Sequence, residues 1–360
     1  MCMYSRNREP MVAPYDIKVL KYLRKRDDGG VVTPCQGAPV TFDEPLVAHP
    51  SIPQWRYEHR DNYGREIYSI GAGVVHAKLT SSSDYGNFCV KAIIPKGTEF
   101  WIDSFGNDIV AEKLVVTTKE VSVKRPLISP KLTEIILKSA PQRNGIRVGD
   151  YQLTDDTFVS PKKGIQAKEV RGQVCGFYKD GTPMICAVER LEAVWDNKYG
   201  TRTTTPTSPN SEEAQKLFNG KEITGLVKKK YPDNKGLEAF QTCTNYRKNE
   251  GENWFFGALG EVMEMLDNAL YLNAARAITG IGFVIDRQYW YWSCSEDDSD
   301  CSFCCDLRDG MVRRGWGYKY CRGGVVPFFA SKDEEKKATA IKRHKLAEYA
   351  TRLCNFFKGH

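Results

Sequence analysis

The chain has 360 residues, of which 41% are hydrophobic and 11% aromatic, and its 52 basic and 45 acidic residues give a formal net charge of +7. This length predicts two or three domains, and the apolar content excludes a disordered chain. The positive excess is mild, whereas a nucleic-acid-binding protein usually concentrates its basic residues more strongly.

The first residues, MCMYSRNREPMVAPYD, lack the apolar run of about 7–15 residues that a secretory signal needs. No stretch approaches the ~18 consecutive apolar residues of a transmembrane helix. We therefore expect a protein that is made in the cytoplasm, has no signal peptide, is not inserted in a membrane, and leaves the cell, if it does, by lysis. Most of the 12 cysteines should then be reduced.

The N-terminal part of the chain divides into two predicted segments. Residues 1–65 are rich in proline and show no sustained period, which predicts an irregular arm or anchor segment. Residues 66–164 contain short β-branched and aromatic runs separated by turns such as Pro95-Lys96-Gly97. That alternation predicts a β-rich domain.

The following region, residues 165–330, mixes strand and helix signals. QVCGFYKDGTPMICAV predicts a hairpin that turns at Asp180-Gly181. Helices are predicted over 236–247 and over 257–278, where the apolar residues follow a three-four spacing. A capping pattern of Ser331 and Glu334 opens a charged helix at 331–360, which docks on this chain or on a partner.

Residues 294–324 carry an unusual cluster of cysteines, arginines, glycines and aromatic residues. Cys301-x-x-Cys304 resembles half of a zinc knuckle, but a second closely spaced pair and any histidine are missing from this stretch. Arginines beside tyrosines could bind nucleic acid by contacting phosphates and stacking on bases, although several aspartates among them would repel a phosphate backbone. No histidine lies within 165–330, and no P-loop, dinucleotide fingerprint or HExxH occurs, so we expect no enzyme and no cofactor.

SFCCDLRDG within this window alternates like a strand with one buried face. We expect Phe303, Cys305 and Leu307 to point inward. The residues between them, Cys304, Asp306 and Arg308, are expected to point outward.

The composition of residues 297–324 has a genetic interpretation. Of these 28 positions, 22 are Cys, Arg, Gly, Ser, Asp or Tyr. Replacing one or both adenines of an asparagine codon produces all six of these residues and never Trp, Met or Lys. Met311, Trp316 and Lys319 would then be fixed positions among varying ones. An ordinary glycine-rich, charged loop is the alternative that composition leaves open.

The ordered motifs resemble the variable proteins of diversity-generating retroelements, which place a hypervariable segment on a C-type lectin fold. The frame comprises the KDG hairpin (179–181), SEEAQKLFNGKEIT (211–224), NWFFGALGEV (253–262), YWSCSE (291–296) and VVPF (325–328). The chain departs from the family pattern in having Phe256-Gly257 where Leu-Pro is usual and Val326 where an arginine is usual. It also continues for about 30 residues beyond the frame.

The resemblance implies an α+β fold, with a C-terminal C-type lectin-like domain at 165–330 preceded by a β-rich domain. Residues 294–324 would be its variable segment and ligand-binding face. The candidate binding residues are Cys294, Asp297, Asp298, Asp300, Cys301, Cys304, Asp306, Arg308, Asp309, Arg313, Arg314, Trp316, Tyr318, Tyr320, Cys321 and Arg322. The constant scaffold residues are Trp254, Glu261, Trp292, Ser293, Glu296 and Pro327.

The leading hypothesis is host attachment by a phage tail-fibre protein, located in the tail of the virion, because virion proteins need no signal peptide and leave by lysis. Its partners would be a host cell-surface protein or glycan receptor and other tail proteins, with a trimeric assembly left open and no nucleic acid or metal bound. A cellular surface adhesin is the second hypothesis. The third is an oxidase like the formylglycine-generating enzymes, which needs a reactive cysteine pair.

Overall fold

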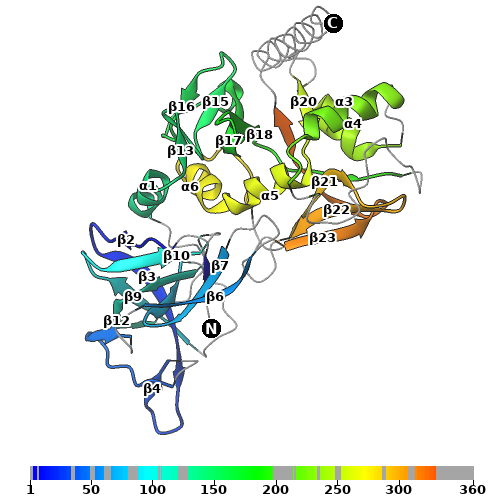
Figure 1. The fold of residues 1–360 in the computed structure, drawn as a ribbon. Helices are drawn as coiled ribbons and strands as arrows, with labels where there is room; N and C mark the ends of the chain where they lie inside the picture. The colour runs from blue at the N-terminus through cyan, green and yellow to red at the C-terminus, as the bar shows by residue number, and fades with distance from the viewer. Residues whose placement is uncertain are drawn as a thin grey trace, which may run out of the picture.

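The computed structural model describes residues 3–5, 8–33, 37–48, 53–60, 66–79, 88–103, 106, 108–120, 129–197, 214, 216–232, 236–247, 253–285, 289–306 and 313–329. These residues form 25 β-strands and five α-helices. The blue and cyan strands of the N-terminal part pack together at the lower left of Figure 1, and the green, yellow and orange elements lie above them and to their right. The helix predicted over 331–360 falls outside the described residues.

The predicted α+β class with a C-type lectin-like domain is wrong. Strands dominate the described residues, and they form several sheets. All strand pairs of the five sheets are antiparallel except one, β21 with β24. The short motifs that suggested the lectin fold specify local strands and turns, and such motifs leave open how the sheets connect.

The N-terminal part contains a nine-stranded sheet and a three-stranded sheet. Met3, Ile70 and Trp101 belong to a small apolar cluster that joins the two sheets. The smaller sheet consists of β1 (Met3–Ser5), β7 (Glu66–Ala72) and β6 (Gln54–Arg60). The larger one runs in the order β2 (Met11–Val12), β10 (Glu99–Ile102), β11 (Asp108–Ala111), β8 (Val75–Lys78), β3 (Ile17–Lys25), β9 (Phe88–Ile94), β12 (Lys113–Glu120) and β5 (Pro45–Val47), with β4 (Val31–Val32) paired to β3.

Residues 1–65 are not the irregular arm that their prolines predicted. β3 lies inside the nine-stranded sheet, between β8 and β9. Its Ile17, Val19 and Leu23 are buried in the apolar core of this sheet. Pro10 and Pro14 precede the strand, where a missing N–H leaves the strand ladder intact.

Two helices close the core of the nine-stranded sheet. α1 (Pro130–Lys138) begins at Ser129, whose Oγ accepts a hydrogen bond from the Leu132 N–H at 3.1 Å. It packs beside α6 (Ala269–Thr279), as Figure 1 shows. Leu132 of α1 and Ala274 of α6 share one apolar cluster with β3 and β12. The N-terminal sheet and the helices after residue 129 therefore form a continuous core.

The predicted hairpin at Asp180-Gly181 is confirmed. It joins two antiparallel strands, and Gly181 has a φ of 87°, which a glycine adopts without strain. These strands belong to a six-stranded sheet in the order β16 (Phe158–Val159), β15 (Tyr151–Leu153), β17 (Val170–Phe177), β18 (Pro183–Cys186), β25 (Pro327–Phe329) and β20 (Trp254–Phe256). A two-stranded ribbon and a short 3-10 helix lie nearby in the sequence: β13 (Gln142–Arg143), β14 (Ile146–Arg147) and Ala167–Glu169.

The helix predicted over 236–247 is confirmed as α4 (Glu238–Asn245), and α3 (Gly220–Lys230) precedes it. The helix predicted over 257–278 is divided into α5 (Leu259–Asp267) and α6. Asn268 separates them, and its Nδ2 donates to the Cys175 carbonyl at 3.0 Å. This tertiary hydrogen bond fixes the break, which the apolar spacing alone does not reveal.

Candidate ligand-binding surface

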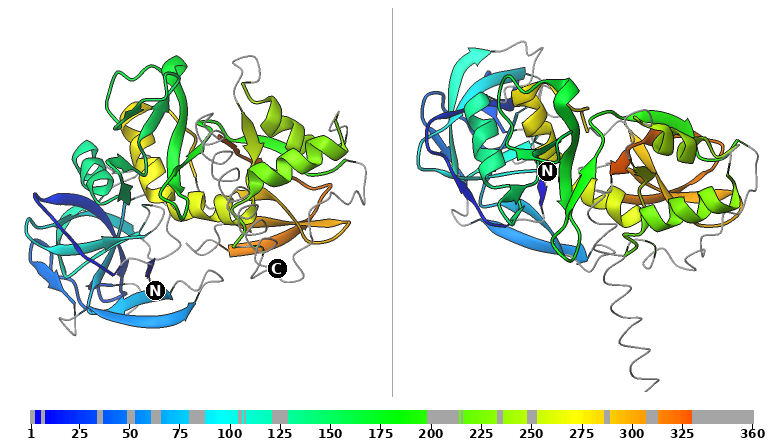
Figure 2. Two further views of the ribbon diagram at one scale, coloured as in Figure 1. Left: turned by 45° about the horizontal axis from the view of Figure 1, so that its top comes forward. Right: turned by 90° about the horizontal axis from the view of Figure 1, so that it is seen from above.

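The window 294–324, drawn in orange in Figures 1 and 2, belongs to a five-stranded sheet that lies to the right of the N-terminal part in Figure 1. The window begins within strand β21, and its next residues form strand β22. The strand order is β19 (Leu191–Val194), β24 (Arg322–Val325), β21 (Trp290–Glu296), β22 (Cys301–Asp306) and β23 (Arg313–Tyr318).

β21 and β22 are covered on both faces. Phe303 and Cys305 pack into the apolar cluster that includes α5. Trp292 and Cys304 pack on the other side in a second cluster, which includes Phe240 and other residues of α4. The expectation that Cys304 points outward is therefore wrong, because Cys304 is buried in this second cluster, which includes residues of α3 and α4.

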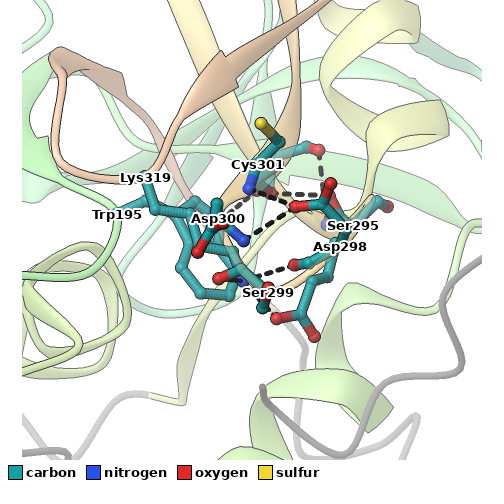
Figure 3. Close-up of polar contacts among 10 residues, drawn as sticks. Trp195, Ser295, Asp298, Ser299, Asp300, Cys301 and Lys319 are labelled. Carbon is teal, nitrogen blue, oxygen red and sulfur yellow. Dashed lines mark hydrogen bonds and ion pairs between the residues drawn. The ribbon is translucent and has the colours of Figure 1, made fainter. Parts of the chain in front are cut away.

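The buried side chain of Lys319 organises the edge of this sheet. Lys319 is 1% exposed and forms an ion pair with Glu296, which is also buried. Its Nζ also donates to the carbonyl oxygens of Asp298 at 2.8 Å and Ser299 at 3.0 Å. The same nitrogen lies 4.5 Å from the centre of the Trp195 ring, a cation–π contact. Figure 3 shows Lys319 beside Trp195 and near Asp298, Ser299 and Asp300.

The backbone of Lys319 joins three segments. Its N–H donates to the Asp300 carbonyl at 2.9 Å, and its own carbonyl accepts from the N–H groups of Trp195 at 2.8 Å and Asp196 at 3.0 Å. The lysine thus ties residues 297–300 to the end of β19 through both side chain and main chain. The sequence marked Lys319 as a fixed position without giving it a role, and Trp195 was not among the candidate site residues.

We call residues 297–300 the acidic loop. Asp298 shapes it, because its Oδ1 accepts from the N–H groups of Asp300 and Cys301, both at 2.7 Å. The N–H groups of Asp297 and Asp298 donate to the Cys301 carbonyl, both at 3.2 Å. The main chain of the acidic loop is therefore fixed by local hydrogen bonds and by Lys319.

The tyrosine turn, residues 318–321, follows directly. Tyr318 and Tyr320 are 46% and 45% exposed, whereas Lys319 between them is buried. The two rings stack with centroids 5.3 Å apart and an angle of 11° between their planes. Tyr318 pairs with Cys301 across β22 and β23, so the tyrosine turn lies beside the end of the acidic loop.

Arg322 follows the tyrosine turn and is directed toward neighbouring elements. Its Nη2 lies 3.3 Å from the Glu238 carboxylate at the start of α4. Its Nη1 donates to the Glu192 carbonyl of β19 at 3.2 Å. The positive charge of Arg322 is thereby placed against an acidic side chain.

The structure sorts the predicted binding residues by exposure. Cys294, Cys301 and Cys304 are buried, and burial raises the thiol pKa of Cys294 well above its ordinary value. Two further residues, Asp297 and Cys321, are half-buried. The exposed ones are Asp298, Asp300, Tyr318, Tyr320 and Arg322. Asp306, Arg313, Arg314 and Trp316 lie on β22 and β23, where the structure describes their backbone, and Arg308 and Asp309 fall outside the described residues.

The six predicted scaffold residues, Trp254, Glu261, Trp292, Ser293, Glu296 and Pro327, are all buried. Glu261 accepts hydrogen bonds from three donors: the N–H groups of Ala258 at 2.7 Å and Gly220 at 3.1 Å, and the Tyr178 hydroxyl at 2.9 Å. Burial outweighs these donors and raises the pKa of Glu261 to about 7. Ser293 donates from Oγ to the Phe303 carbonyl at 2.8 Å, which links β21 to β22.

The cysteines of the window do not gather into a site. Cys301 and Cys304 are three residues apart on one strand, so their side chains leave opposite faces of the sheet. Among the residues that the structure describes, no group of three or more Cys, His, Asp and Glu side chains is arranged to hold a metal ion. Burial also raises the pKa of the Cys301 thiol, which disfavours the thiolate that an oxidase would use.

Comparisons with known proteins find only distant similarity to this chain. No family model matches the sequence, and no curated protein matches it. A solved structure with a similar course is a fimbrial protein from Bacteroides ovatus, with a TM-score of 0.41 and 13% sequence identity. The match covers 88% of this chain and 71% of that protein. Among the described helices, none has the length and apolar character needed to cross a membrane.

Proposed function

We propose that this chain is a ligand-binding attachment protein of a phage particle, whose binding surface includes the acidic loop and the tyrosine turn. The observation that carries the proposal is the alternation of exposed Tyr318 and Tyr320 around buried Lys319. Tyrosines supply large contact area at low conformational cost and are frequent at binding hot spots. A rigid support beneath them reduces the entropy lost on binding.

The burial pattern also bears on the hypothesis of retroelement diversification. Lysine cannot arise from an adenine-altered asparagine codon, and Lys319 is the residue that ties the acidic loop to the end of β19. The exposed Asp298, Asp300, Tyr318 and Tyr320 belong to the residue types that such codons produce. The buried cysteines have a packing role, so they no longer support diversification.

Small side chains are required at some positions of the window. A Cβ added at Gly317 would lie 2.9 Å from the Trp292 ring, and one at Gly323 would lie 2.8 Å from the Trp290 ring. Contacts this close force the aromatic rings to shift. We therefore restrict the proposed diversification to the exposed positions.

Sequencing the codons for 294–324 and their flanking DNA across many clones of one lineage tests the diversification. We expect variation at 298, 300, 318 and 320, invariance at 317, 319 and 323, and a template copy with a reverse transcriptase gene nearby. An invariant segment without a template would refute diversification and leave ligand binding to be tested separately.

The double variant Tyr318→Ala/Tyr320→Ala tests ligand binding. Particles that carry it should adsorb to cells of their propagating strain at least about tenfold more weakly, because truncating hot-spot tyrosines costs about 2 kcal/mol or more. Tyr57→Ala is the matched control, since Tyr57 is 50% exposed on β6. Both proteins should unfold at the urea concentration of the unmodified chain.

Unchanged adsorption by the double variant would contradict the proposed binding surface. Detection of the chain on cell envelopes, and its absence from purified particles, would instead favour the surface-adhesin hypothesis.

A further inference from the structure

The helix α3 buries little apolar surface. Of its 11 residues, the buried ones are Gly220, Ile223, Thr224 and Val227. Only Ile223 and Val227 carry apolar side chains into a core cluster, the one that contains Trp292. A segment with so few buried apolar side chains is the kind that opens locally while the rest of a protein stays folded.

The sequence of α3 also adds little helical stability of its own. Gly225 lies inside the helix, and a Cβ placed on it would meet no atom within 4 Å. A glycine at such an open position lowers the helix equilibrium about fivefold relative to alanine. The N-cap residue, Asn219, makes no capping hydrogen bond with its side chain. The start of α3 therefore depends on partners from other elements.

Two polar contacts hold the inner face of α3. The Gly220 N–H donates to Oε2 of Glu261 at 3.1 Å. One turn later, Oγ1 of Thr224 accepts from the Phe256 N–H of β20 at 3.1 Å and donates to the Phe256 carbonyl at 3.4 Å. A Cβ added at Gly220 would lie 2.4 Å from Oε2 of Glu261, so the main chain of α3 lies directly against this carboxyl group.

Glu261 caps two helices at once. Its Oε2 also accepts from the Ala258 N–H, at the start of α5, and its Oε1 accepts from the Tyr178 hydroxyl. The residue is 1% exposed, and burial is the reason why its pKa is raised to about 7. The carboxyl group that holds α3 to α5 thus changes its charge near neutral pH.

The titratable groups around this carboxyl group come from the elements packed beside it. The Tyr178 hydroxyl follows β17, the Cys175 thiol lies on β17, and the Cys294 thiol lies on β21. Burial is the main cause of the raised pKa of both thiols, and Glu261 adds to it. Both thiols therefore stay protonated near pH 7. The helices themselves contribute Glu264 on α5 and, in the first turn of α3, Lys221 and Glu222.

We infer that α3 opens locally from α5 and β20, and that ionisation of Glu261 makes this opening more frequent as the pH rises. The carboxyl group is buried while α3 is closed, whereas water reaches it when α3 opens. The closed state therefore binds the proton more tightly. Its advantage is complete below about pH 4.5 and is lost as the pH rises through 7.

The opening has a consequence for the five-stranded sheet. Trp292 of β21 shares its apolar cluster with Ile223 and Val227 of α3, and its Nε1 donates to the Cys321 carbonyl at 3.2 Å. An open α3 removes part of the packing around Trp292, which supports the end of the tyrosine turn. This opening is independent of which ligand the tyrosine turn binds.

Amide hydrogen exchange of the purified full chain measures the open population, with mass spectrometry of peptides from 220–231 and correction for the intrinsic exchange rate at each pH. Protection of α3 should fall about tenfold or more between pH 5 and 7 and level off above pH 7.5. Exchange of α3 should respond weakly to low urea concentrations. Exchange of α6, which lies in the core beside α1, should need global unfolding and respond strongly.

Three variants make the result specific. Glu261→Gln keeps an acceptor for the Gly220 N–H and cannot ionise, so protection of α3 should lose its pH dependence. Glu222→Gln removes an exposed carboxylate from the first turn of α3 and should keep that dependence. Gly225→Ala should raise protection of α3 about fivefold at every pH and leave α6 unchanged.

Equal protection of α3 and α6, with equal response to urea, would show that α3 opens only when the whole chain unfolds and would overturn the inference. Protection that is constant from pH 5 to 8, or that keeps its pH dependence in Glu261→Gln, would remove the role of Glu261. If Glu261→Gln does not fold, Gly225→Ala still decides, because a rise in protection shared by α3 and α6 contradicts local opening.

Discussion

Replacing Lys319 with methionine should lower the free energy of unfolding by about 3–5 kcal/mol, the cost of leaving one partner of a buried ion pair alone. Glu296 would lose its buried ion pair with Lys319, and the carbonyls of Asp298 and Ser299 would lose the donor that Nζ supplies. Urea denaturation of the purified chain measures the change. Lys96→Met is the control, because Lys96 is exposed in the turn after β9.

The double variant Glu296→Gln/Lys319→Met distinguishes the ion pair from simple packing. It removes both charges together, so it should recover part of the stability lost in Lys319→Met. The acidic loop would still lack the Nζ donor, and binding through the tyrosine turn should therefore remain weak in the double variant. If Lys319→Met unfolds at the same urea concentration as the unmodified chain, the ion pair has no structural role.

Glu261 should make the stability of the protein depend on pH. Its folded pKa of about 7 lies above the ordinary value of 4.5, so the folded chain binds more protons than the unfolded chain between these values. The corresponding stabilisation is complete below about pH 4.5 and is lost as the pH rises through 7. The shift corresponds to about 3 kcal/mol. Urea midpoints measured from pH 4.5 to 8 would reveal it.

Two substitutions test the origin of this effect. Glu261→Gln should abolish the pH-dependent part, since its amide can accept from Ala258 and Gly220 and donate to the Tyr178 oxygen. Glu261→Ala leaves two buried N–H groups without an acceptor and should cost about 3 kcal/mol or more at every pH. Glu222→Gln, at an exposed site on α3, is the control. A pH profile that survives in Glu261→Gln would assign it to another group.

Local features of the sequence predicted local structure well. The Asp180-Gly181 turn lies between two β-prone runs, and its glycine has the positive φ that such a hairpin favours. The apolar spacing of α5 likewise marks the face that packs in the core. These signals depend only on residues that are close together in the chain, so they can be recognised in a single sequence.

Long-range pairing could not be predicted from the same signals. Cys304 alternates as a surface residue would, and it is buried in an apolar cluster with residues of α3 and α4, which lie far earlier in the chain. β3 was obscured by the prolines around it, although its Ile17 and Val19 are deeply buried. The genetic code indicated only that Lys319 is a fixed position. Its partner Trp195 lies far away in the chain. Sheet order is decided by such distant contacts.

The strands β24 and β25 have a consequence for synthesis. β24 pairs with β19 and β21 in the five-stranded sheet, whereas β25, two residues later, lies between β18 and β20 in the six-stranded sheet. A growing chain therefore holds both sheets incomplete, with unpaired strand edges, until residues 322–329 leave the ribosome. Such edges invite pairing between chains. In cells that make this protein at high rates, nascent chains that stop before residue 322 should therefore aggregate far more than completed chains.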